Sequence, residues 1–412
     1  MKPSAPPDRV PPTPDAAPVA YCTNVHPGVT LNEVRANLAR YAAAVRDRVC
    51  PGRVLPVGLW LGADAAAAAA RDPAAVADLS RFLTDHGLAV ASLNAFPFGP
   101  FHGRPVKDAV YLPHWADPAR LTYTRDAARV LAGLLPEAAE GGVSTLPLGW
   151  PPHVDDPATF RSEAAARLTD LVHHLARLEL DTGRLVHVDL EPEPGCLLQS
   201  AADVVGFFDR HLLGTPDELS VRAYLRVCHD VCHSAVMFEP QSEALAAYRD
   251  AGLTLGRVQI SSAPALDFDT LDDDRWAPAA AALAAFAEPH YRHQTCVRDA
   301  GGAVRRYPDL PDALAAERTR DPAGRLRGEW RVHFHVPLHR TRVGPDRLLH
   351  TTRPDVTALF QALQDHPDRP RLETETYTWG VLPGDRVDDD ALIAGLAEEL
   401  TWAKDAAAVR LT

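Results

Sequence analysis

The sequence predicts an α/β protein built as a single (β/α)8 TIM barrel. Short apolar runs rich in β-branched residues alternate along the chain with longer segments of helical periodicity. This alternation is typical of a parallel sheet covered by helices. About eight strand–helix units can be recognised, and eight units close such a sheet into a barrel.

The expected strands are short and regularly spaced. They cover residues 19–24, 56–61, 89–94, 143–148, 185–190, 223–228, 257–261 and 372–377. Helices are expected between them at residues 31–49, 74–86, 122–135, 162–178 and 391–400. In a barrel of this type the functional side chains lie at the carboxyl ends of the strands, so the residues that follow each strand are the first candidates for a site.

Three segments fall outside this repeat. Residues 1–18 are proline-rich and polar, which predicts a disordered segment ahead of a barrel of residues 19–412. Residues 97–115 form a long loop rich in Gly, Pro and aromatic residues, and we expect it to cover the barrel mouth as a lid or pocket wall. Residues 288–342 are expected to be an insertion between strands seven and eight, with strand-like pieces around a charged helical stretch.

The composition favours a cytoplasmic protein that acts on small molecules. The chain has 412 residues, of which 46% are hydrophobic, and this is sufficient for one large core. Its formal net charge of −13 disfavours nucleic acid and anionic membranes as partners. No apolar run approaches the roughly 20 residues that a membrane span needs, and no apolar core of a secretory signal is present. The six cysteines form no Cys-x-x-Cys pair and are expected to be reduced.

Two carboxylates follow strand five. Glu191 and Glu193 lie on one face of the extended chain, because residues two apart in a strand share a face. A proline after each of them keeps the chain extended. We expect this pair to enter the barrel mouth. The alternative is a solvated acidic loop, which the apolar strand leading into the pair argues against.

Strand six ends in an Asp-x-x-His motif. Asp230 and His233 are three residues apart at a strand-to-loop turn, a spacing that can direct an oxygen and an imidazole nitrogen at one ion. Ordinary loop hydrogen bonding is the alternative. Cys228, His229 and Cys232 suggest a zinc–thiolate site, but a second thiolate pair is missing, so buried structural cysteines are the favoured interpretation.

Strands seven and eight carry further candidates. Gln259 lies among apolar residues of strand seven, where either a metal or a hydrogen-bond partner would satisfy its amide. On strand eight Glu373, Glu375 and Tyr377 share a face. Two carboxylates there are costly to bury unless a cation or a proton compensates them. The sequence leaves open which glutamate is a ligand. If the face that carries them points outward, neither is a ligand.

Other polar residues are candidate substrate contacts. His333 and His335 share a face in the insertion, and they either reach the barrel mouth or belong to a surface hairpin. Tyr377 on strand eight is a further candidate. The remaining ones come from the end of strand one, the lid and the insertion: Asn24, His26, His102, Lys107, Trp115, Arg292 and Gln294.

Together these residues predict a divalent-metal site. The expected ligands are mostly oxygen donors with a little nitrogen: Glu191, Asp230, Gln259, Glu375 or Glu373, and His233. Such a set suits Mn, Mg, Co or Zn. A metal there could polarise a carbonyl or hydroxyl group of a bound sugar or polyol, while a neighbouring carboxylate moves the proton.

These motifs resemble known proteins at two levels. The Asp-x-x-His motif, with carboxylates ending strands five and eight, resembles the xylose isomerase-like TIM barrel superfamily, which includes sugar phosphate isomerases and epimerases and endonuclease IV. Longer motifs resemble EboE, a bacterial family described as a metabolite traffic protein. They are Tyr-Cys-Thr-Asn-Val-His-Pro-Gly (21–28), Leu-Asn-Ala-Phe-Pro-Phe-Gly-Pro-Phe-His-Gly (93–103), Val-Lys-Asp-Ala-Val-Tyr-Leu-Pro-His-Trp (106–115), Ser-Thr-Leu-Pro-Leu-Gly-Trp (144–150), Leu-Glu-Pro-Glu-Pro-Gly-Cys (190–196), Asp-Val-Cys-His (230–233) and Glu-Thr-Tyr-Thr-Trp (375–379).

The resemblance to EboE covers residues 20–412 and implies a cytoplasmic barrel that makes or moves a small metabolite. Other proteins of the Ebo gene cluster are then candidate partners. The wider superfamily often has a histidine on strand seven, where this chain has Gln259. This departure puts the transfer of a complete catalytic metal site in doubt.

Two functions are compatible with these features. The first is metal-dependent isomerisation or epimerisation of a sugar, polyol or prenylated precursor. In it Glu191 and Glu375 bind metal and flank the substrate, one of them or Glu193 is the base, and His233 and His335 orient substrate oxygens. The second is a binding or handover protein whose aromatic lid holds a metabolite without turnover. A DNA-repair phosphodiesterase like endonuclease IV is disfavoured by the negative charge and by an incomplete histidine set.

Overall fold

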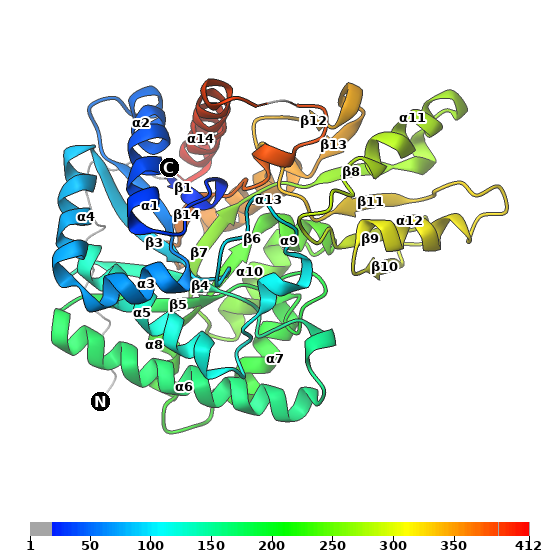
Figure 1. Cartoon of the computed structure of the whole chain (residues 1–412). Helices are drawn as coiled ribbons and strands as arrows, with labels where there is room; N and C mark the ends of the chain where they lie inside the picture. The colour runs from blue at the N-terminus through cyan, green and yellow to red at the C-terminus, as the bar shows by residue number, and fades with distance from the viewer. Residues whose placement is uncertain (1–18, 386, 412) are drawn as a thin grey trace.

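The structure is a computed structural model that describes residues 19–385 and 387–411. The segment for which the sequence predicts disorder, residues 1–18, lies outside the described residues. The described chain forms a barrel with an additional antiparallel sheet at one side (Figure 1).

Eight parallel strands close into a barrel, which confirms the predicted fold class. In chain order they are β1 (Val19–Cys22), β2 (Leu55–Trp60), β3 (Leu88–Asn94), β4 (Glu140–Thr145), β5 (Leu185–Leu190), β6 (Leu225–Asp230), β7 (Leu255–Ile260) and β14 (Arg371–Thr374). β14 pairs with β7 on one side and with β1 on the other, and so closes the barrel. All carboxyl ends of the strands therefore lie at one mouth.

Most strand boundaries differ from the predicted ones by one to three residues, and three of them have a clear cause. β4 ends at Thr145 rather than at residue 148, because Leu148 has a left-handed conformation (φ 67°) that a strand does not contain. β6 begins at Leu225 rather than at residue 223, because the preceding residues end a helix. β14 ends at Thr374, so the residues that follow it line the mouth instead of pairing with a neighbour.

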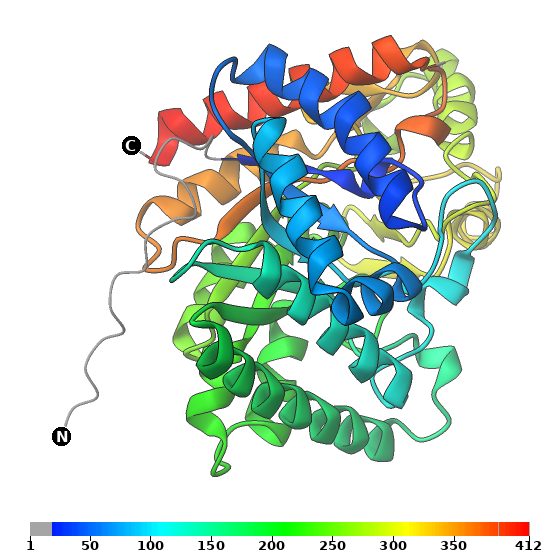
Figure 2. The ribbon, with the colours of Figure 1, turned by 60° about the vertical axis from the view of Figure 1, so that its left-hand side comes forward.

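Helices cover the outside of the barrel, as Figure 2 shows from a second direction. They are α1 (Leu31–Asn37), α2 (Ala43–Val49), α3 (Ala63–Arg71), α4 (Pro73–Asp85), α5 (Pro118–Leu134), α6 (Pro157–Thr182), α7 (Ala201–His211), α8 (Glu218–Tyr224), α9 (Val231–Val236), α10 (Gln241–Asp250), α13 (Arg353–Gln364) and α14 (Asp389–Leu411). A π-helical turn joins α1 to α2. No helix in the described part of the chain is long and apolar enough to cross a membrane.

Three of these helices begin at an Asp-Pro pair. Asp72, Asp117 and Asp156 each accept a hydrogen bond from a backbone N–H of the first turn, and the following proline occupies the first helical turn. This signal explains why α5 and α6 begin at residues 118 and 157, ahead of the predicted starts at 122 and 162.

The barrel interior contains a fully buried ion pair. Arg257 on β7 donates to the carbonyl oxygens of Leu93 and Gly142 at 3.0 and 2.8 Å, and its Nη1 lies 3.9 Å from Glu373 Oε2. The space for the Glu373 carboxylate exists because β2 carries a glycine: a Cβ on Gly58 would lie 1.9 Å from Glu373 Oε1.

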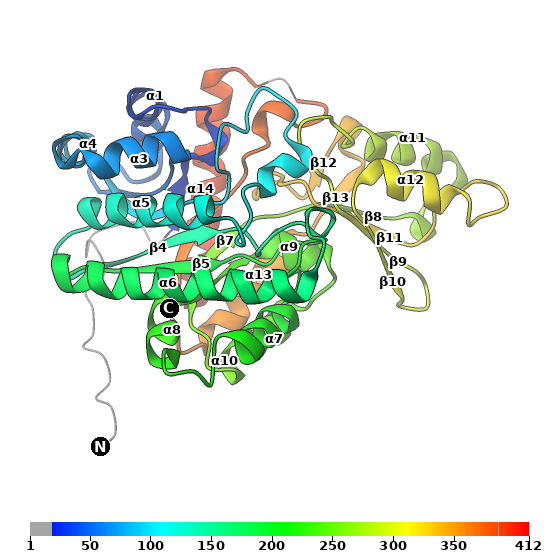
Figure 3. The same cartoon turned by 60° about the horizontal axis from the view of Figure 1, so that its bottom comes forward.

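A second sheet is inserted between β7 and β14, as the sequence predicts. Its antiparallel strands are ordered β10-β9-β11-β8-β13-β12. The elements are β8 (Pro264–Asp267), α11 (Asp273–Ala284), β9 (Thr295–Arg298), β10 (Val304–Tyr307), α12 (Leu310–Arg318), β11 (Glu329–Val332), β12 (Arg342–Val343) and β13 (Leu349–Thr351). They enclose a separate apolar core and extend on both sides of the expected range 288–342. Figures 1 and 3 show this sheet projecting from one side of the barrel.

The predicted lid, residues 97–115, is attached to the insertion. It contains a short 3-10 helix, Lys107–Tyr111. The backbone N–H groups of Val106 and Lys107 donate to the carbonyl oxygen of His290 at 2.8 and 3.1 Å. Lys107 Nζ lies 2.8 Å from Asp309 Oδ2. These bonds hold the lid and the insertion together over the barrel mouth.

Candidate functional site

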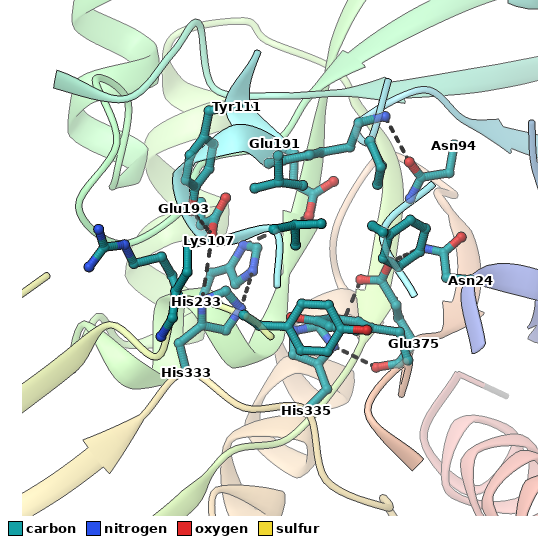
Figure 4. A pocket seen from close by; sticks show the side chains of 18 residues that line it. Asn24, Asn94, Lys107, Tyr111, Glu191, Glu193, His233, His333, His335 and Glu375 are labelled. Atoms are coloured by element: carbon teal, nitrogen blue, oxygen red, sulfur yellow. Dashed lines mark hydrogen bonds and ion pairs between the residues drawn. The ribbon is translucent and has the colours of Figure 1, made fainter. Parts of the chain in front are cut away.

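A pocket of about 610 Å3 opens at the barrel mouth (Figure 4). Its walls come from the carboxyl ends of the barrel strands, from the lid and from the insertion. The lining residues are Asn24, Asn94, Phe96, Pro97, Phe101, Val106, Lys107, Val110, Tyr111, Glu191, Glu193, His233, Tyr291, Arg292, His333, His335, Glu375 and Tyr377. The lining therefore combines acidic and histidine side chains with apolar and aromatic ones.

Three carboxylates from three barrel strands converge at this pocket: Glu191 and Glu375 line it, and Asp230 lies beside them. Glu191 follows β5, Asp230 is the last residue of β6, and Glu375 follows β14. One oxygen of each lies within 4.8 Å of the other two, and all three residues are buried. We call Glu191, Asp230 and Glu375 the carboxylate centre.

The carboxylate centre is electrostatically unfavourable without a cation. Burial, followed by the neighbouring carboxylates, raises the pKa of Glu191 and of Glu375 well above the ordinary value. Burial also acts to raise the pKa of Asp230, but His233 and His335 outweigh it and lower that pKa. Glu191 Oε2 and Asp230 Oδ2 are buried and have no hydrogen-bond partner among the described residues. A divalent cation fits these unpartnered oxygens.

His335 completes this group from the insertion. Its Nδ1 lies 2.7 Å from the carbonyl oxygen of Glu375. Because a carbonyl oxygen only accepts, Nδ1 carries the proton and Nε2 carries the lone pair. Nε2 is buried without a hydrogen-bond partner in the described structure and lies 3.9 Å from Asp230 Oδ2. The carboxylate centre thus has one inward-facing nitrogen donor beside it.

Two of the expected ligands, Gln259 and Glu373, belong neither to the pocket lining nor to the carboxylate centre. Gln259 on β7 accepts a hydrogen bond from the Cys228 thiol at 3.3 Å, deeper in the barrel. Glu373 accepts from Ser92 Oγ at 2.6 Å and lies beside Arg257. Of Glu373, on β14, and Glu375, just after it, only Glu375 lines the pocket.

A second group of donors lies beside the carboxylate centre. Glu193, His233 and His333 each offer a ligand atom, and these atoms lie within 4.8 Å of one another. The Nε2 atoms of His233 and His333 are 3.1 Å apart. Burial raises the pKa of Glu193, although His233 and hydrogen bonds from Tyr111 and Gln294 oppose this effect. We call Glu193, His233 and His333 the histidine pair site.

Four of the expected substrate contacts line the pocket besides the histidines. Asn24 donates from Nδ2 to Glu375 Oε1 at 2.5 Å. Tyr377 packs against His335 with ring centroids 4.9 Å apart. Lys107 and Arg292 also line the pocket, but each is paired with Asp309.

The other four expected contacts support the site from behind or lie elsewhere. His26 stacks on Tyr41, and burial lowers its pKa to about 3. His102 lies 2.6 Å from the carbonyl oxygen of Asn24. Trp115 is fully buried and donates to Thr145 Oγ1 at 3.2 Å. Gln294 holds Glu193 and His333 in place, as described below.

Sequence reasoning did not select two pocket residues that carry polar groups, Asn94 and Tyr291. Asn94 is the last residue of β3, so the rule that strand ends carry functional groups could have identified it. Tyr291 enters the pocket from the insertion, where no local pattern separates it from a core residue. Of the aromatic residues in and next to the lid, which the binding alternative requires, Phe96, Phe101 and Tyr111 line the pocket.

Comparisons with known proteins establish the fold and little else. No family model matches the sequence, and no curated protein matches it. A solved xylose isomerase-like TIM barrel protein from Mycobacterium smegmatis, in complex with magnesium, is similar over 96% of this chain and 98% of its own, with 13% identity and a TM-score of 0.52. An L-ribulose 3-epimerase is similar over 96% of this chain and 95% of its own, with 13% identity and a TM-score of 0.49. The chain therefore has the xylose isomerase-like barrel fold.

Proposed function

We propose that this protein is a metal-dependent enzyme with isomerase- or epimerase-like chemistry on a small metabolite. The observation that carries the proposal is the carboxylate centre: three buried acids from three strands, two of them with unpartnered oxygens. Burying such a group is costly unless a cation compensates it. The magnesium complex of the similar barrel protein is consistent with this choice.

Glu191, Asp230 and Glu375 are the proposed metal ligands, with His335 as the nitrogen donor. This set of three carboxylates and one imidazole suits Mn, Mg, Co or Zn. His335 then takes the place for which the sequence offered Gln259, whose oxygen is engaged by Cys228. A bound divalent ion would polarise a carbonyl or hydroxyl oxygen of the substrate.

The proposed base is a carboxylate of the same pocket. Glu191 and Glu193 follow the same strand, and both face the pocket. Tyr111 Oη and Gln294 Nε2 donate to Glu193 Oε1 at 2.6 and 3.0 Å, which fixes the position of this carboxylate. Burial raises the pKa of Glu193, so its carboxylate is a stronger proton acceptor than an exposed one. His233 is proposed to orient substrate oxygens.

The aromatic residues of the pocket support a substrate with an apolar part. The Tyr377 ring contacts Phe101 and Tyr291, with centroid separations of 6.4 and 5.2 Å. A free sugar offers little apolar surface to these rings, whereas a prenylated polyol or a cyclic precursor offers more. The sequence motifs resemble EboE, and on that basis we propose a cytoplasmic role in a biosynthesis or export pathway with Ebo-cluster partners.

The proposal is tested by metal content and proton exchange. We expect the purified protein to hold a stoichiometric divalent ion, and Glu191→Ala to lose it. In D2O the metal-loaded protein should incorporate deuterium next to the carbonyl group of a ketose panel or of a copurifying ligand, and the variant should not. Glu163→Gln, an exposed acid on α6, is the control. A metal-free wild type, or equal metal in Glu191→Ala, contradicts the proposal.

A second candidate is a binding or handover protein, which the aromatic residues of the pocket favour. In this case the pocket holds a metabolite without turning it over. Mass spectrometry of ligands that copurify from cells discriminates the two. An unchanged ligand on a metal-free protein, without deuterium incorporation, supports the handover role.

A further inference from the structure

The two imidazoles of the histidine pair site present lone pairs to each other. His233 Nδ1 lies 2.9 Å from the carbonyl oxygen of Pro192, so Nδ1 carries the proton. His333 Nδ1 lies 2.7 Å from Gln294 Oε1. Gln294 is oriented by its Nε2, which donates to Glu193 Oε1 at 3.0 Å, so its oxygen faces His333 and accepts the Nδ1 proton. Both Nε2 atoms are then acceptors, 3.1 Å apart.

Two acceptors at this distance repel each other unless a proton or a cation lies between them. Two nitrogens bound to one zinc ion at about 2.0–2.1 Å in a tetrahedral site lie roughly 3.3 Å apart, close to the observed separation. Glu193 also offers a ligand atom within 4.8 Å of both imidazoles, so three donors converge where a shared proton would need only two. The geometry therefore favours a metal ion.

We propose that Glu193, His233 and His333 hold a second metal ion, of the zinc type, beside the carboxylate centre. Glu193 supplies the third ligand, since Tyr111 and Gln294 both donate to Oε1. Among the described residues, the only hydrogen-bond partner of Oε2 is then the Cys196 thiol, 3.9 Å away. Three protein ligands that also line the pocket leave the fourth position open to a ligand, the arrangement of catalytic zinc sites.

The supporting contacts resemble those that position metal ligands. Each imidazole is fixed through its Nδ1 proton, one by a backbone carbonyl and the other by a side-chain amide. The Pro192 carbonyl lies between Glu191 and Glu193 in the chain, so one loop serves both centres. A substrate bound in the pocket would then meet two cations, which goes beyond the single ion of the proposed function. With the second ion bound, Glu193 and His233 act as its ligands, and the base is Glu191 or Glu375, the alternatives to Glu193.

Metal titration of the full-length chain tests this inference. The protein is stripped with a chelator, loaded with Zn2+ or Co2+, desalted and analysed for bound metal. We expect about two equivalents in the wild type and about one in His333→Asn, whose amide retains the donor to Gln294 but has no second nitrogen at the Nε2 position. The affinity for this ion should fall by more than the roughly 10–100-fold that is lost when a residue hydrogen-bonded to a metal ligand is removed. His290→Ala, in the same insertion but outside the pocket, should retain both equivalents.

A parallel variant separates this site from the carboxylate centre. Glu375→Gln should lose the other equivalent and retain the visible Co2+ bands of the site with two imidazoles. His333→Asn should lose those bands and retain the bands of the carboxylate centre, which has one imidazole from His335. Should His333→Asn not fold, Glu193→Gln replaces it, because its Oε1 still accepts from Tyr111 and Gln294. One equivalent in the wild type, or the same equivalent lost in both variants, overturns the second site. Two equivalents retained in Glu375→Gln and one in His333→Asn leave this site standing and contradict the carboxylate centre.

Discussion

The barrel interior and the barrel mouth both bury acidic side chains, and they compensate them differently. Glu373 on β14 faces Arg257 and Ser92 inside the barrel. Glu375, two residues further on and just beyond the end of β14, faces two other acids at the mouth. Despite the opposing effect of burial, Glu373 raises the pKa of Arg257. Burial and neighbouring acids instead raise the pKa of Glu375. In the interior, Arg257 thus compensates the buried acid, whereas at the mouth a bound metal ion could do so.

The cations nearest the mouth do not neutralise its acids. Lys107 and Arg292 line the pocket, but their ion pairs are with Asp309 and Asp108, which join the lid to the insertion. The amide of Asn24 donates to Glu375 without adding charge. This difference in compensation predicts opposite responses to substitution in the two regions.

Removal of the interior cation should have the largest effect. Arg257→Met leaves Glu373 buried and unpaired, and we expect the free energy of unfolding to fall by about 3–5 kcal/mol. Chemical denaturation measures this. The double variant Arg257→Met/Glu373→Met should recover much of the loss. Glu375→Gln should leave the metal-free protein as stable as the wild type or more so. Equal destabilisation by both single variants would show that the two regions do not differ.

Addition of metal should affect the mouth alone, with a somewhat smaller effect. At a free metal concentration about 100 times Kd, the free energy of unfolding should rise by about 2.7 kcal/mol for each site that binds only the folded chain. Glu375→Gln should lose this gain for the carboxylate centre, and Glu163→Gln should retain it. Thermal and chemical unfolding with and without metal provide the measurement. A gain that Glu375→Gln retains in full would place the ion elsewhere.

The change in the free energy of unfolding per pH unit should be the smallest of the three effects. The pKa values of Glu191 and Glu375 are raised by folding, so the metal-free folded protein binds more protons than the unfolded chain. Its stability should therefore fall as pH rises above about 4.3, by up to about 1.4 kcal/mol per pH unit for each group.

The comparison with Glu375→Gln isolates the contribution of the mouth. Glu399 on α14, whose pKa burial raises to about 7, adds a similar slope in both proteins and cancels in the difference. Saturating metal should remove the difference, because the bound ion keeps the carboxylates ionised. A pH slope that is the same in wild type and variant would mean that Glu375 does not titrate in this range.

The sequence predicts the barrel well because its strands and helices are local patterns. Strand five was placed to the residue, since the apolar run 185–190 is bounded by a glycine turn and by the Glu-Pro-Glu-Pro segment. The starts of α5 and α6 were placed too late, because an Asp-Pro cap stands ahead of the first apolar residue. The alternation rule grouped Glu373 with Glu375 correctly on one face. It contains no information on how deep in the barrel each of the two side chains lies.

What the sequence by itself determined is which acids stand near strand ends, and hence that Glu191, Asp230 and one of Glu373 and Glu375 meet once eight parallel strands share one mouth. Tertiary structure alone decided the rest. It placed Glu373 beside Arg257, engaged Gln259 with Cys228, and brought His335 to Asp230 from an insertion about a hundred residues downstream. The physical reason is that periodicity fixes the direction of a side chain along its own element, whereas the partner that compensates a buried charge is set by the packing of distant segments.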